Sequence, residues 1–462
     1  MRTTCILVLC LGIGACGDEV PSATDAGLDG GSSMASDAGL APWPPPGDTV
    51  PCRLLLPIDA VEGGDVHCVD VPGSDGGDVS VHATVFDATL PALPVYVLMG
   101  GPALRGAAYV PHLDAATRLV RFGARPVVYV EQRGVGVSEP ALRCNAGEDL
   151  AACAQRLRDG GLDLGRFDTA HAADDVAAVA DRLGHGTFAI AGGSYGSRLG
   201  LEVLRRHGGR VARAYLSSLV APDDDFLRAM VEATGEALDA LCEDCATEVL
   251  ARAGERARTA PPASSFGPLG EALLGFAVFE ALYHQDLAAT LPGTLDAFAS
   301  GRVDGVDGLE AALGRPPQVD RLAYQAVLCA DLAPHFDAEA YADAAAEAPA
   351  TLGPLLASIG ATFDGCAALG IAPGPAESRT PVVSDVPTLL VAPGLDGRTP
   401  ASAAARVAAT LSAARTLVLP GRVHTPALGY QLEGRPIDVC AGSVLRAFLD
   451  DPAGELPTCD AL

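Results

Sequence analysis

The sequence predicts an α/β fold in which a helical cap interrupts a mostly parallel, doubly wound sheet. Short apolar runs bounded by turn residues recur along the chain, as is typical of strands buried on both faces. Helical patterns separate several of these runs, so helices are expected on both sides of a parallel sheet. The strand pattern disappears after residue 220 and returns near residue 386, so the helical insertion interrupts one domain.

Seven apolar runs are the predicted strands, and four segments have helical spacing. The strands are 79–86, 93–99, 126–131, 187–191, 212–216, 386–391 and 415–419. The helices are 169–183, with Thr169 as its N-cap, then 197–207, 226–241 and 269–287.

These elements divide the chain into five segments. Residues 1–15 are the predicted signal peptide and residues 16–50 a disordered tether. The core of the fold occupies residues 51–220 and 381–462, and the helical cap occupies residues 221–380.

Composition excludes several classes of protein. The chain has 31 basic and 58 acidic residues, a formal charge of −27, so nucleic acid is not an expected partner. Hydrophobic residues make up 49% of the 462, which excludes wholesale disorder. We expect no transmembrane helix after the signal segment, and no cofactor, because the sequence contains no zinc motif, phosphate loop or dinucleotide fingerprint.

The N-terminus predicts export. Arg2 precedes the short apolar run 5–14, and small residues stand directly before Cys16. This segment resembles a bacterial lipoprotein signal, in which Cys16 would be lipidated and would anchor the protein to a membrane of the cell envelope. Ordinary secretory cleavage after Ala15 is the alternative.

Ten cysteines remain after Cys5, Cys10 and Cys16, and an even number suits disulfides in an oxidising compartment. Pairing neighbours along the chain closes the smallest loops. The expected pairs are Cys52–Cys68, Cys144–Cys153, Cys242–Cys245, Cys329–Cys366 and Cys440–Cys459. A zinc half-site at Cys242 and Cys245 is disfavoured because no second half has matching spacing.

Ser194 is the candidate nucleophile. It is the centre of Gly192-Gly193-Ser194-Tyr195-Gly196, between a predicted strand and a predicted helix. This G-x-S-x-G pattern in a strand–turn–helix context exposes a serine hydroxyl at a sharp turn. A glycine-rich turn that merely joins the two elements is the alternative.

A serine nucleophile needs a base, and the base needs an orienting carboxylate. Asp396 follows a predicted buried strand at the sheet edge where ligand groups cluster. With the chain order serine, acid, histidine, His424 is the single histidine after Asp396. The predicted oxyanion donors are the backbone N–H of Tyr195 and that of Gly101, whose loop follows an early strand.

Three motifs occur in the order seen in prolyl and tripeptidyl aminopeptidases. They are Met99-Gly100-Gly101-Pro102-Ala103, the stretch Tyr129-Val130-Glu131-Gln132-Arg133-Gly134-Val135-Gly136-Val137-Ser138, and the Ser194 motif. Residues 386–400, 419–426 and 440–459 resemble the C-terminal part of tripeptidyl-aminopeptidase-like proteins. The chain from residue 51 onward therefore resembles this group of α/β-hydrolases.

The resemblance implies an α/β-hydrolase fold, joint action of Ser194, Asp396 and His424, a helical cap over the site, and peptide substrates held near their free amino end. The motifs depart from the family at Met99, Ala103 and Glu131, where the family often has His, Gly and Asp.

Holding an ammonium requires carboxylates. Glu280 is the candidate substrate-binding residue and Asp286 a second, although a solvated helix face is the competing interpretation. An esterase or lactonase of the same fold, or a lipid-anchored binding protein without catalysis, would fit the same sequence.

Overall fold

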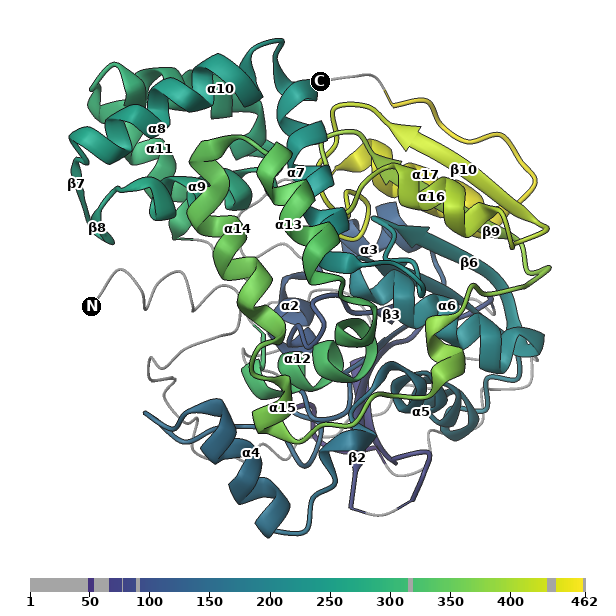
Figure 1. The fold of residues 1–462 in the computed structure, drawn as a ribbon. Coiled ribbons are helices and arrows are strands. Elements are labelled where there is room, and N and C mark those ends of the chain that lie inside the picture. Colours follow the sequence, from purple (N-terminus) through teal and green to yellow (C-terminus); the bar gives the residue numbers. More distant parts are fainter. Residues whose placement is uncertain are drawn as a thin grey trace.

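The computed structural model describes residues 49–53, 66–76, 78–88, 92–314, 319–429 and 438–459. The predicted signal peptide, Cys16 and nearly all of the tether lie outside the described residues. Figure 1 shows two parts, a sheet with flanking helices and a group of helices beside it.

One eight-stranded sheet forms the core, as the sequence predicts, and it is mostly parallel. Its order is β1 (Val66–Pro72), β2 (Ser80–Phe86), β4 (Val127–Val130), β3 (Val95–Leu98), β5 (Phe188–Gly193), β6 (Val211–Ser217), β9 (Thr388–Pro393) and β10 (Ala414–Leu419). Only β1 and β2 pair antiparallel with their neighbours; the other adjacent pairs are parallel. The sequence analysis missed β1.

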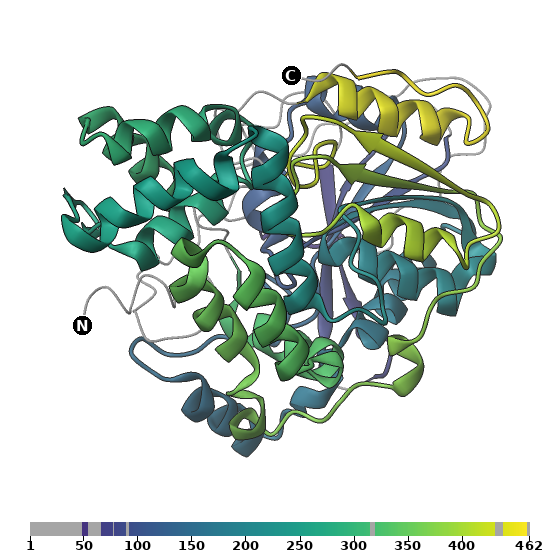
Figure 2. The ribbon, with the colours of Figure 1, turned by 45° about the horizontal axis from the view of Figure 1, so that its top comes forward.

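Helices cover both faces of the sheet, which Figure 2 shows from the side. One face packs against α3 (Ala115–Phe122) and α17 (Val439–Asp450). The other packs against α5 (Thr169–Arg182), α6 (Tyr195–His207) and α16 (Ser402–Ala408). Every residue of the central strands β3, β4, β5 and β9 is buried, which explains their unbroken apolar runs.

The N-cap prediction for α5 was wrong by one residue. Asp168 caps the helix, because its carboxylate accepts a hydrogen bond from the backbone N–H of His171, and Thr169 is the first helical residue. Both residue types suit an N-cap, so composition alone could not separate them.

The helical cap lies between β6 and β9, which pair directly with each other. The insertion therefore leaves the sheet continuous. Its helices are α7 (Phe226–Leu241), α8 (Leu250–Thr259), α9 (Glu271–Ala281), α10 (Gln285–Ala299), α11 (Val303–Leu313), α12 (Arg321–Val327), α13 (Ala338–Glu347), α14 (Gly353–Gly360) and α15 (Cys366–Leu369). A separate apolar core holds most of them together.

Two features of the cap differ from expectation. Helix 269–287 is broken, because His284 is extended and α9 and α10 are separate. The cap also contains a two-stranded ribbon, β7 (Ala263–Ser264) and β8 (Gly267–Pro268), where no strand was predicted.

One stretch of the described residues, Ala350–Leu369, has the length and mean hydropathy of a membrane-spanning helix. Leu355, Leu356 and Ile359 within it are buried in the cap core. Core helices of soluble domains meet the same test, so this stretch is weak evidence for a span.

The described residues contain five disulfides. They join Cys52 to Cys68, Cys144 to Cys153, Cys242 to Cys245, Cys329 to Cys366 and Cys440 to Cys459. These are the pairs expected from loop size, and such a set is typical of an exported protein.

Candidate active site

Ser194 lies at a sharp turn between β5 and α6. Its backbone has φ +57°, a conformation that non-glycine residues rarely adopt. The flanking glycines make the turn possible: a Cβ at Gly192 would lie 2.2 Å from the Gly196 carbonyl oxygen, and one at Gly196 would lie 2.2 Å from that of Leu98. Ser194 is half-buried and ends a strand at the same edge as the predicted acid and base.

Asp396 and His424 are in direct contact. His424 Nδ1 lies 2.8 and 2.9 Å from the two carboxylate oxygens of Asp396, and both residues are buried. The Asp396 carboxylate also accepts hydrogen bonds from the backbone N–H of Arg398 and from the N–H and hydroxyl of Thr399. This carboxylate is therefore held in place and in turn orients the imidazole.

The environment of Asp396 favours its charged form. Burial alone would raise its pKa, but His424 and hydrogen bonds from His424, Ser218 and Thr399 outweigh burial and lower the pKa below its usual value. An ionised acid next to imidazole Nδ1 leaves Nε2 as the proton acceptor on the opposite side of the ring.

Backbone contacts bring the Ser194 turn to the His424 loop. A Cβ added at Gly193 would lie 2.7 Å from Thr425 Cγ2, so the residue before the serine packs on the residue after the histidine. Ser218 strengthens this arrangement, because its hydroxyl accepts a hydrogen bond from the Thr425 N–H. Within the described residues, no hydrogen bond joins the Ser194 hydroxyl to His424; in unliganded enzymes this bond is often long and tightens with substrate.

The loop with the proposed oxyanion donor lies next to the Ser194 turn. Gly196 packs against the end of β3, where this loop begins, and Gly101 has φ +106°. Gln132 holds the loop at both ends: its Nε2 donates to the Met99 carbonyl (2.9 Å) and its Oε1 accepts from the Ala103 N–H (3.1 Å). Tyr195 is the first residue of α6, where backbone N–H groups have no partner within the helix.

Glu131, at one of the departures from the family motif, is a buried carboxyl beside this loop. Its Oε2 accepts a hydrogen bond from the Ala107 N–H, while Oε1 has no hydrogen-bond partner among the described residues. Burial raises its pKa to about 8, and the neighbouring Asp320 adds to the increase. This environment favours the neutral form of Glu131.

The side chain of Tyr195 connects the nucleophile turn to the cap. Its hydroxyl lies 2.9 Å from Thr169 Oγ1, which donates to the buried Asp331 of the cap. Asp331 also accepts a hydrogen bond from the Thr169 N–H. Burial, with a contribution from Asp168, raises the pKa of Asp331 to about 6.

Glu280 is buried in the cap, so the solvated-face interpretation does not hold for it, whereas Asp286 is exposed. Glu280 Oε1 accepts a hydrogen bond from Arg398 (2.6 Å), two residues after Asp396, and Oε2 has no partner among the described residues. The Arg398 guanidinium lies over the Phe279 ring. The Tyr283 ring is 5.1 Å from the His424 ring.

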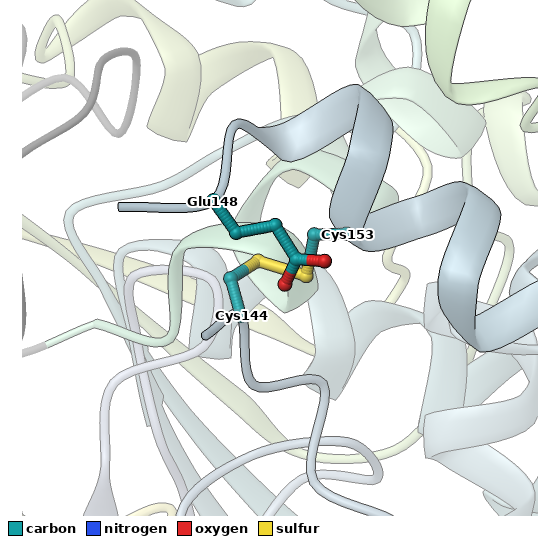
Figure 3. Close-up of side chains that lie close together, drawn as sticks. All are labelled: Cys144, Glu148 and Cys153. Carbon is teal, nitrogen blue, oxygen red and sulfur yellow. A yellow bond between two sulfur atoms is a disulfide. The ribbon is translucent and has the colours of Figure 1, made fainter. Parts of the chain in front are cut away.

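Two cysteine groups resemble metal sites, but their sulfurs are already bonded. Cys242 and Cys245 form a disulfide, and so do Cys144 and Cys153, beside Glu148 (Figure 3). The Glu148 carboxylate accepts two hydrogen bonds from Arg156. Neither group therefore offers thiolate ligands in this state.

The sequence analysis missed four residues that support the site. Ser218 follows a predicted strand, and Gln132 lies within a quoted motif, so the position of each in the sequence could have identified it as a residue near the site. Arg398 lies within the quoted stretch 386–400 and had the same signal. Gln285, a residue of the cap, had none, because its role depends on how the cap docks.

Comparison with solved structures finds similar proteins at low sequence identity. One is a proline iminopeptidase from Mycobacterium smegmatis, with 18% identity, coverage of 83% of this chain and 98% of that chain, and a TM-score of 0.42. Another is an esterase from Rhodococcus sp. ECU1013, with 16% identity, coverage of 84% and 99%, and a TM-score of 0.41.

No curated protein sequence matches the chain. The family model of the alpha/beta hydrolase fold matches residues 94–427, which is more than half of the chain. The chain therefore belongs to the α/β-hydrolase fold family.

Proposed function

We propose that the protein is a serine hydrolase that cleaves peptides from their free amino end through an acyl-enzyme on Ser194. The observation that carries the proposal is the buried Asp396–His424 pair, whose loop packs on the strained turn of Ser194. A hydrolase is the class of enzyme that the family supports. The geometry of the site and the aminopeptidase-like motifs support the finer assignment.

In the proposed reaction, the Ser194 hydroxyl attacks the scissile carbonyl carbon while His424 Nε2 accepts the hydroxyl proton. Backbone N–H groups of Tyr195 and Gly101 stabilise the negative charge on the carbonyl oxygen. His424 then donates the proton to the leaving amine. Water attacks the acyl-enzyme with His424 again as base, which releases the acid and restores Ser194.

Glu280 supports the preference for a free amino end. Its Oε2 is a buried acceptor without a hydrogen-bond partner among the described residues, and Oε1 is linked through Arg398 to the loop of Asp396. A substrate ammonium could bind this oxygen while Arg398 keeps the other. Because Arg398 already balances one negative charge, we expect Glu280 to orient the amino end more than to attract it from solution.

Replacing Ser194 tests the proposed nucleophile. Ser194→Ala is expected to lower turnover by roughly four to six decades, because the members of such a triad act as a unit. A fluorophosphonate probe should label the wild-type protein and not the variant. Wild-type turnover in the purified variant would exclude Ser194 as the nucleophile. Absence of labelling in the folded wild-type protein would favour a binding protein without catalysis.

A matched substrate panel tests the acyl group. Aminoacyl and tripeptidyl amides, their N-acetylated counterparts and short-chain esters should be compared on wild-type protein and Glu280→Gln. We expect the wild-type protein to cleave the free-amine substrates faster than the acetylated ones. Glu280→Gln should reduce this difference in rate and leave the rate of ester cleavage unchanged. Efficient cleavage of esters alone would instead identify an esterase.

The proposed location is the bacterial cell envelope, with a lipid anchor at Cys16. The five disulfides support export to an oxidising compartment. Mass spectrometry of the mature N-terminus tests the anchor, which Cys16→Ala should abolish. An unmodified N-terminus at residue 16 would instead support ordinary secretory cleavage.

A further inference from the structure

The break between α9 and α10 creates a corner of the cap, residues 280–285, above the proposed site. The backbone turns because the Tyr283 N–H donates to the Glu280 carbonyl and His284 adopts an extended conformation. A continuous helix over residues 269–287, as the sequence predicts, would not make this turn. The corner has a specific set of contacts with the loops of Asp396 and His424.

Gln285, the first residue of α10, holds the loop that carries His424. Its Nε2 donates to the Gly421 carbonyl (2.8 Å), and its Oε1 accepts from the Val423 N–H (3.2 Å). The donor and the acceptor of the Gln285 amide thus both bind the backbone of residues 421–423, directly before His424.

This loop needs support because its backbone is irregular on both sides of the histidine. Gly421 has φ +69° and Thr425 has φ +50°, so neither residue belongs to a regular element. The loop also supports its neighbour, since the Arg422 carbonyl accepts a hydrogen bond from the N–H of Leu395, next to Asp396. A shift of the Gln285 contacts would therefore move the base relative to both Asp396 and Ser194.

We propose that Gln285 is a positioning residue, through which the cap holds the His424 loop in its catalytic geometry. This inference rests on the proposed function, in which His424 is the base. Gln285 acts on the loop backbone and has no role in binding the acyl group. Its loss should therefore lower the rate of the chemical step and leave substrate affinity nearly unchanged, since small displacements of a reacting group cost large factors in rate.

The test compares Gln285→Ala with Gln325→Ala, a matched control in the same cap. Gln325 also donates from its amide to a backbone carbonyl, that of Thr362, and among the described residues it has no hydrogen bond to the Asp396 or His424 loop. We expect Gln285→Ala to lower kcat about 10- to 100-fold with KM within about threefold. Labelling by a fluorophosphonate should slow by a similar factor, whereas Gln325→Ala should label at close to the wild-type rate.

Gln285→Glu adds a conservative variant. It retains an acceptor for the Val423 N–H and loses the donor to the Gly421 carbonyl, so it should fall between the wild type and Gln285→Ala. Unchanged kcat and labelling in folded Gln285→Ala, or equal losses in Gln285→Ala and Gln325→Ala, would overturn the inference. If Ser194→Ala still abolishes labelling in that case, the proposed function stands; a wild-type protein that does not label would remove both.

Discussion

Two loops meet at Ser194, and a single glutamine holds each of them, but the two glutamines come from different parts of the molecule. Gln132 follows β4 in the core and bonds to Met99 and Ala103, at the two ends of the proposed oxyanion loop. Gln285 belongs to the cap and forms hydrogen bonds with residues 421 and 423 of the His424 loop. The hydrogen bonds have the same form, and only the origin of the amide differs.

This difference separates the site into a loop whose glutamine comes from the core and a loop whose glutamine comes from the cap. The proposed oxyanion loop, between β3 and β4, also has a backbone contact with the cap, because the Asp320 N–H donates to the Ala103 carbonyl (3.1 Å). The His424 loop is held in part by Gln285, more than 130 residues away along the chain. We infer that displacement of the cap would disturb the His424 loop through Gln285 and the proposed oxyanion loop through Asp320, whereas the Gln132 contacts would remain.

The largest expected effect comes from Asp396, the acid that holds His424. Asp396→Asn should lower kcat by about 10⁴-fold, because an amide cannot hold the imidazole in the required tautomer. Steady-state kinetics at several pH values measure this loss, and the residual rate of Ser194→Ala gives the background. A loss below tenfold would mean that Asp396 does not orient the base.

Gln132→Ala should have the second largest effect. Removing this buried amide leaves the Met99 carbonyl and the Ala103 N–H without their partner, so we expect roughly tenfold to 100-fold lower kcat and about 1–3 kcal/mol lower stability. Esters and amides should be affected alike, because both develop an oxyanion. A kcat that falls only for peptides would contradict this role.

Different parts of this arrangement were accessible from sequence. The G-x-S-x-G motif selected Ser194, and the strand-end position of Asp396 together with chain order selected Asp396 and His424 as its candidate partners. The two glutamine contacts depend on side-chain placement across tertiary interfaces, and no local pattern encodes that. No Gly or Pro marks the break at residues 282–284, so the periodicity predicted one helix. In the structure α9 and α10 are separate helices that meet at the corner of residues 280–285.

Two buried carboxyls beside these loops have opposite pKa shifts. The pKa of Glu131 is raised from 4.5 to about 8, so the unfolded chain loses this proton first and stability falls as pH rises between these values. The pKa of Asp396 is lowered, so its contribution is present above its unfolded value of 3.8 and is lost as pH falls through the folded value.

Glu131→Gln should therefore raise the free energy of unfolding at pH 8 relative to the wild type and flatten its dependence on pH between 4.5 and 8. Denaturant unfolding across this range, with Asp396→Asn as a comparison, measures both slopes. A wild-type stability that rises toward pH 8, with no change in Glu131→Gln, would show that Glu131 ionises normally in the folded protein.

The smallest expected effect tests whether the cap contact through Tyr195 matters for activity on the oxyanion side. Thr169 Oγ1 bridges the Tyr195 hydroxyl and Asp331 of the cap, so Thr169→Val removes this bridge while the Thr169 N–H keeps its bond to Asp331. We expect about 1–2 kcal/mol lower stability, since a buried hydrogen bond is lost, and less than about threefold change in kcat. The core contacts of Gln132 should then maintain the oxyanion loop. A fall in kcat as large as that of Gln285→Ala would mean that both halves of the site depend on the cap, and the contrast between the two glutamines would lose its functional meaning.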